Sequence, residues 1–134
     1  MTLILSNDDV ERLLSMPDCI AALEEAYVEM AAGRGITRTR SDCIAPTSYS
    51  DDAVYGLKSM DGIVPKFGVG AIRINSDIVT NPMVGNVQRR VKVPAAPNDR
   101  YVGLVLLFST DNGEPLAIFP DGVCDYSRPD VGRP

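Results

Sequence analysis

The strongest constraint on the fold is a pair of apolar runs late in the chain, residues 100–109 (RYVGLVLLFS) and 115–119 (PLAIF), separated by TDNG. Asn112 and Gly113 in that linker favour the positive φ angles of a tight turn, so the two runs are predicted to pair as a β-hairpin. A two-stranded hairpin is only marginally stable by itself in water. The two runs therefore need further strands, or a second layer, to bury them.

Three segments with alternating periodicity supply such strands: residues 36–46 (ITRTRSDCIAP), 53–60 (AVYGLKSM) and 67–76 (FGVGAIRINS). Residues 76–99 contain several prolines and glycines and are predicted to form a long loop, with a short strand at 89–93 (RRVKV). The sum is an antiparallel meander that follows the N-terminal segments.

Two helices are predicted before the strands. Ser6 or Asn7 can cap the first, and Pro17 and Gly33 mark the beginning and the end of the second. Apolar residues of the second helix recur at helical spacing and require a surface to cover; they are Ile20, Leu23, Tyr27 and Met30. The predicted fold class is α+β, with the N-terminal helices packed on a mostly antiparallel sheet.

Composition excludes several classes of function. The chain has 134 residues, a formal net charge of −5 and no histidine. Catalysis by a histidine base and histidine-bound zinc are therefore excluded, and no metal site is predicted. The negative charge argues against nucleic acid or an anionic membrane as a partner. The three cysteines show no C-x-x-C spacing, and each is predicted to be a small buried apolar residue of a reduced, cytoplasmic protein.

Four cations lie within the alternating strands, namely Arg38, Arg40, Lys58 and Arg73, and alternation is predicted to put Arg38 and Arg40 on one face with Asp42. If the strands pair, these side chains can converge on one sheet face and hold a carboxylate through bidentate hydrogen bonds. The alternative is that they are solvated residues of an outer face. The G-x-G at Gly68 and Gly70 is not followed by a helix pattern, so a dinucleotide-binding loop is not predicted there.

Several longer stretches of the sequence resemble one known family. The opening stretch, MTLILSNDDVERLLSMPDCIAALEEAYVEMAAGRG, is similar to the beginning of the ornithine cyclodeaminase and mu-crystallin family, and GLVLLFSTDNGEPLAIFPDG is similar to that family's hairpin. The stretches GLKSMDGIVPKFGVGAIRINSDI and RRVKVPAAPNDRYVGLVLLFS resemble the branch of the family that is named for a subunit of tyramine oxidase. The resemblance covers residues 1–123, and residues 124–134 form a polar tail that departs from the family and is expected to be disordered.

The resemblance implies a substrate-binding and dimerisation domain. Family members are homodimers in which such a domain precedes a Rossmann domain that binds NAD or NADP, and they convert small amino, keto or imino acids. Arg40 matches the family's carboxylate-binding arginine. The family's strand lysine is replaced by Gly70, which leaves Lys58 and Arg73 as further candidates for substrate binding, while catalytic residues are not identified.

The departure after Gly122 leads us to expect a truncated chain that lacks the Rossmann domain and its cofactor and does not catalyse the reaction alone. The alternatives are a non-catalytic module that dimerises or binds a small carboxylate, and a gene fragment without function. The hairpin is expected to leave an apolar edge or face exposed between Leu104 and Phe108 in a lone chain, and to bury it on dimerisation.

Overall fold

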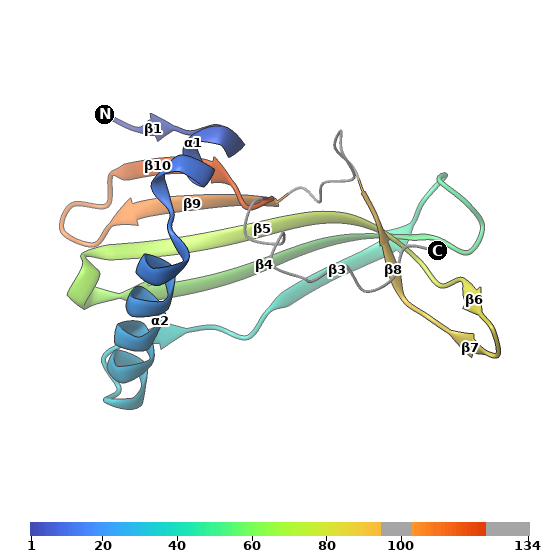
Figure 1. Ribbon diagram of the computed structural model, residues 1–134, viewed down its shortest axis with the longest axis horizontal. Helices are drawn as coiled ribbons and strands as arrows, with labels where there is room; N and C mark the ends of the chain where they lie inside the picture. The colour runs from blue at the N-terminus through green and yellow to red at the C-terminus, as the bar shows by residue number, and fades with distance from the viewer. Residues whose placement is uncertain (95–102, 123–134) are drawn as a thin grey trace.

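The protein is described by a computed structural model over residues 1–94 and 103–122 (Figure 1). Two α-helices and one 3-10 helix occur in these ranges: α1 (Asn7–Leu13), α2 (Met16–Ala31) and η1 (Pro65–Phe67). The strands before the middle of the chain are β1 (Leu3–Ile4), β2 (Ile36–Thr37), β3 (Ser41–Pro46) and β4 (Val54–Val64). The later strands are β5 (Val69–Thr80), β6 (Met83–Val84), β7 (Val87–Gln88), β8 (Val91–Val93), β9 (Gly103–Ser109) and β10 (Pro115–Pro120).

An 8-stranded sheet forms the body of the molecule, with the order β1-β10-β9-β5-β4-β2. The long strands β4 and β5 pair along their whole length, β3 continues the edge of β4, and β8 pairs with the far end of β5. Among the strands of the described residues, only the short β1 runs parallel to its neighbour, β10. The predicted α+β class with a mostly antiparallel sheet is confirmed, and β9 and β10 form the predicted hairpin with Gly113 at a φ of 75°.

The two helices differ in how they meet the sheet. Helix α1 begins at a capping box of Ser6 and Asp9 and lies against β10, which buries Val10. Helix α2 is capped by Ser15 and lies at one end of the sheet (Figure 1). There Lys66 of η1 forms an ion pair with Glu25. In the described ranges no helix has the length and apolar character needed to cross a membrane.

The predicted strands differ from the observed ones in three places. Residues 36–46 form two strands, β2 and β3, rather than one. Both β4 and β5 extend further than predicted, because each pairs with the other from end to end. The loop predicted for residues 76–99 contains the end of β5 and a separate hairpin of β6 and β7, while the short strand predicted at 89–93 is present as β8. Residues 100–102 and the predicted tail at 124–134 lie outside the described residues.

Cysteines were predicted to be buried, and this is wrong for Cys43, which is exposed on β3. Cys19 on α2 is half-buried, and Cys124 lies outside the described residues. β3 pairs with β4 at the edge of the sheet and all six of its residues are exposed, so neither of its faces buries Cys43.

Strand register assigns each side chain to one of two sheet faces, because directly opposed residues share a face. Lys58 lies opposite Asn75, and Arg73 lies opposite Met60 and Val105. We call the sheet face that carries these side chains the polar face. The other face carries apolar residues that include Leu57, Ile63, Leu104 and Phe108, and we call it the apolar face. Leu104 and Phe108 are 44% and 37% exposed, which confirms the prediction of exposed apolar surface between these two residues.

Candidate functional site

The centre of the polar face holds a buried ion cluster. Lys58 Nζ of β4 lies 2.8 Å from Asp77 Oδ2 of β5, and the two side chains are only 8% and 4% exposed. Lys92 Nζ of β8 lies 3.3 Å from the other oxygen of Asp77. Gly56, directly opposite Asp77, leaves room for this arrangement, since a Cβ at that position would lie 3.2 Å from Lys58 Cε. Three strands thus converge on one carboxylate.

The protonation of Asp77 follows from its two cations. Burial alone would raise the pKa of this carboxyl, but the hydrogen bond from Lys58 and the charges of Lys92 and Lys58 outweigh burial and hold the pKa below its usual value. Asp77 is therefore ionised near neutral pH. Lys58 and Lys92 thus bring two ammonium groups to one carboxylate on this face.

A second ion pair lies beside the first on the polar face. Arg73 Nε of β5 donates to Asp121 Oδ2, and Asp121 directly follows β10. The backbone N–H of Asp121 donates to the carbonyl of Gly103 at 3.1 Å, which continues the pairing of β9 with β10. A Cβ at Gly103 would overlap the Asp121 carboxylate, so this position has room only for glycine in the observed arrangement.

Arg40 lies just before β3, at the accessible margin of the same face. Its Nη2 donates to Asp42 Oδ2 at 2.7 Å, and Asp42 is directly opposite Lys58. The Arg40 side chain is 52% exposed, which makes this the most open of the three pairs. Register brings Lys58 and Arg73 to one face, Arg40 meets that face through Asp42, and each of the three cations has a carboxylate partner from the chain itself.

Arg38 departs from the predicted arrangement. Alternation placed it on one face with Arg40 and Asp42, but the strand is interrupted between β2 and β3. Arg38 Nη2 instead lies 2.6 Å from Asp61 Oδ2, and Asp61 is on the apolar face because it lies opposite Ile72. The interruption thus separates Arg38 from the other cations.

Sequence reasoning identified the cations and put Asp42 on one face with Arg40, but it missed Asp77 and Asp121 as acidic partners. Arg73, Asn75 and Asp77 alternate along β5, and this spacing in RINSD was sufficient to place them on one face. Asn75 is buried there, opposite Lys58. Asp121 could have been found from the hairpin register, which carries β10 past Gly103.

The described residues do not fit a bound dinucleotide. A pyrophosphate requires free backbone N–H groups at a helix N-terminus. The N-termini of α1 and α2 are closed by Ser6 with Asp9 and by Ser15 with Asp18, and these carboxylates would repel phosphate. Gly68 and Gly70 lie at the turn from η1 into β5, not before a helix. Over the described ranges, no group of three or more metal-ligating side chains is found.

Comparison with known proteins finds similar folds but no similar sequences. Neither a family model nor a curated protein matches the chain. The chain aligns with a probable ornithine cyclodeaminase from Bordetella pertussis Tohama I (TM-score 0.64, 15% identity) over 93% of its own length and 32% of the other chain. It also aligns with an archaeal alanine dehydrogenase dimer with bound NAD, with a TM-score of 0.62 and 23% identity. That alignment covers 92% of this chain and 32% of the alanine dehydrogenase chain.

A third solved structure is the Δ1-pyrroline-2-carboxylate reductase of Thermococcus litoralis in complex with NADH and L-proline, with a TM-score of 0.59 and 19% identity. The alignment covers 89% of this chain and 32% of the reductase chain. The chain thus spans about a third of the length of the solved proteins that it matches. It has the fold of that third, as its sequence resemblance to the ornithine cyclodeaminase and mu-crystallin family predicted.

Proposed function

We propose that this chain corresponds to the substrate-binding and dimerisation part of an ornithine cyclodeaminase-like enzyme that acts on a small amino, keto or imino acid. The observation that carries the proposal is the convergence of Arg40, Lys58 and Arg73 on one face of a sheet with this fold. Cations held by a rigid sheet suit recognition of a carboxylate, because the geometry is fixed before the ligand arrives.

Arg40 is the proposed primary ligand of the substrate carboxylate. Its pair with Asp42 is exposed, and an exposed pair contributes about 0–1 kcal/mol, so a ligand can compete with Asp42 at little cost. Lys58 and Arg73 are held by Asp77 and Asp121, whose side chains are buried. We assign these two a supporting role, in which their positive charges lie on the face that would receive the anion.

The proposed reaction requires NAD or NADP, and the described residues offer no site for either. The cofactor would be held by the portion of the longer relatives that this chain does not match. We therefore expect no reduction of NAD when the 134-residue protein is mixed with an amino acid. Turnover would contradict this division of roles, and ligand binding without turnover would equally suit a non-catalytic carboxylate-binding module.

The proposed partner is a second copy of the chain. Leu57, Ile63, Leu104 and Phe108 are exposed on the apolar face, and burial of such a surface is the usual driving force for a stable dimer. The archaeal alanine dehydrogenase with a similar fold is a dimer. A cytoplasmic location remains a prediction from the cysteines alone.

A thermal-shift titration tests carboxylate binding. L-proline, L-ornithine and L-alanine would each be added to the purified chain, and a ligand that binds the folded state raises Tm with concentration. We expect the shift to be lost in Arg40→Ala and retained in Arg38→Ala, whose side chain pairs with Asp61 of the other face. Equal shifts in both variants would contradict the assignment, and non-cooperative melting would favour the non-functional fragment.

A further inference from the structure

The hairpin of β6 and β7 is a projecting arm, which we define as residues 81–90 (NPMVGNVQRR). Its strands pair only with each other, through Met83 with Gln88 and Val84 with Val87. Gly85 closes the turn at a φ of 64°, and Arg89 N–H donates to the Pro82 carbonyl at 3.0 Å. A lone two-stranded hairpin is marginal in water, so an ordered arm benefits from a surface to rest on.

The arm is apolar and basic. Met83 and Val87 are 65% and 62% exposed, and Val84 shares the face of Val87 because the two residues are directly opposed. Arg89 and Arg90 follow at its base, and the segment contains no Asp or Glu. A surface that covers the arm should therefore be apolar with acidic margins.

Helix α2 offers such a surface. A stripe of exposed apolar side chains runs along its whole length; it consists of Met16, Ile20, Leu23, Tyr27 and Met30. Every charged residue of the helix is acidic, namely Asp18, Glu24, Glu25 and Glu29. Glu24 borders the stripe, since it lies four residues after Ile20 and three before Tyr27.

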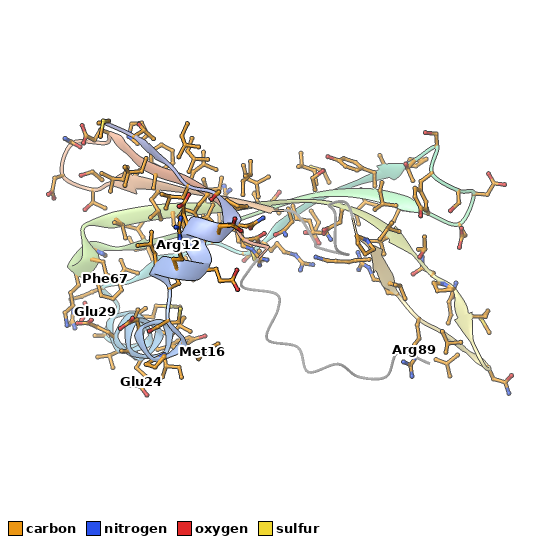
Figure 2. The ribbon with its side chains drawn as sticks, turned by 45° about the horizontal axis from the view of Figure 1, so that its top comes forward. Arg12, Met16, Glu24, Glu29, Phe67 and Arg89 are labelled. Carbon is orange, nitrogen blue, oxygen red and sulfur yellow. The ribbon has the colours of Figure 1, made fainter. Side chains whose placement is uncertain are left out.

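The two surfaces cannot meet within one chain, because they lie at opposite ends of the sheet (Figure 1). They do project toward the same side of it: Figure 2 shows Met16 and Glu24 of α2 at one end and Arg89 at the other, both on one side of the strands. A second copy related by a half-turn would bring each arm beside the partner's α2. The same contact would then form twice in one closed dimer.

We infer that the arm of one copy docks on the α2 stripe of a second copy. Val84 and Val87 meet the stripe around Leu23, and Arg89 and Arg90 lie near Glu24. This inference takes its second copy from the homodimer proposed above, and it adds which surfaces meet. It does not require the apolar face to be the contact.

Sedimentation velocity of the 134-residue chain over a range of concentrations tests the arm. V84D/V87D places two charges in the apolar contact and should raise the dimer dissociation constant by at least about tenfold. The side chains of Val84 and Val87 are both exposed, so the melting curve of a dilute sample should remain cooperative. An unchanged dissociation constant would overturn the inference.

A charge exchange tests the contact without altering the apolar residues. R89E/R90E should weaken the dimer about tenfold, and adding E24R should recover a substantial part of that loss. The matched control adds E114R, which changes net charge equally at the β9–β10 turn and should recover nothing. A monomeric wild-type protein would defeat the homodimer itself, whereas a dimer that tolerates every arm variant would defeat only the arm contact.

Discussion

The two faces of the sheet handle burial in opposite ways. The polar face carries a pair of opposite charges that is almost fully enclosed, Lys58 with Asp77. The apolar face leaves Leu104 and Phe108 in contact with solvent. A protein that is stable as a single chain usually buries apolar side chains and exposes charged ones. The buried charges of the polar face are paired within the chain, whereas the exposed apolar face requires another surface to cover it.

The largest expected effect comes from breaking the balance of the polar face. Asp77→Ala leaves Lys58 buried without its carboxylate, and removal of one partner from a buried pair costs about 3–5 kcal/mol of unfolding free energy. Urea denaturation monitored by circular dichroism measures this loss.

The control for Asp77→Ala is the double variant Lys58→Met/Asp77→Leu. It replaces both charges with apolar groups of similar volume, so the unfolding free energy should return close to that of the wild type. If Asp77→Ala were no more destabilising than an exposed substitution, the polar face would not be the enclosed, balanced cluster described above.

Glycine positions allow a matched comparison of the two faces. Gly103→Ala would force its Cβ into the Asp121 carboxylate and separate Asp121 from Arg73, at a cost of about 1–3 kcal/mol. Gly70→Ala introduces the same methyl on the apolar face, where the nearest side-chain atom is 3.6 Å away, and should change stability by less than about 0.5 kcal/mol. Equal losses of unfolding free energy in Gly103→Ala and Gly70→Ala would contradict the distinction between a closely packed polar face and an open apolar face.

The apolar face should matter for association and not for folding. Phe108→Ser removes an exposed aromatic ring, so the melting temperature of a dilute sample should change little. If this face is part of a dimer contact, the dissociation constant should rise about tenfold, equivalent to about 1.4 kcal/mol. Sedimentation velocity measures the change, with Tyr49→Ser as a control at an exposed aromatic residue between β3 and β4.

The periodicity of the sequence predicted which side chains of one strand share a face, and it failed at Arg38, where the strand is interrupted. Lys58 and Arg73 were candidates for one face because alternation with a period of two is a local property, although the sequence left open whether they face solvent. The hairpin was predicted from its turn residues, Asn112 and Gly113. These predictions hold because strand period and turn chemistry depend on near neighbours.

The partners of the cations could not be predicted from local pattern. Lys58 meets Asp77 only because the register sets Asp77 opposite Gly56, two pairs along from Lys58 and Asn75 and therefore on the same face. Arg73 and Asp121 are 48 residues apart in sequence. Such pairs depend on long-range register, which a single sequence does not fix. The arm was also missed, although the turn residues Gly85 and Asn86 between two valines were a signal for a hairpin.

Lowering the pH is expected to change the unfolding free energy least, and to affect variants of the polar and apolar faces differently. The pKa of Asp77 is lowered in the folded protein, so this group contributes stability above its unfolded pKa and loses it as pH falls through the lower folded pKa. Asp9 behaves in the same way, with a pKa lowered to about 2 by hydrogen bonds from Ser6 and by Arg12, and it titrates in every variant. The acid-induced loss of unfolding free energy should therefore be smaller in Lys58→Met/Asp77→Leu than in the wild type, and unchanged in Phe108→Ser. Denaturation at a series of pH values between neutrality and strong acid measures both differences, and an equal loss in all three proteins would show that the Asp77 cluster does not set the acid sensitivity.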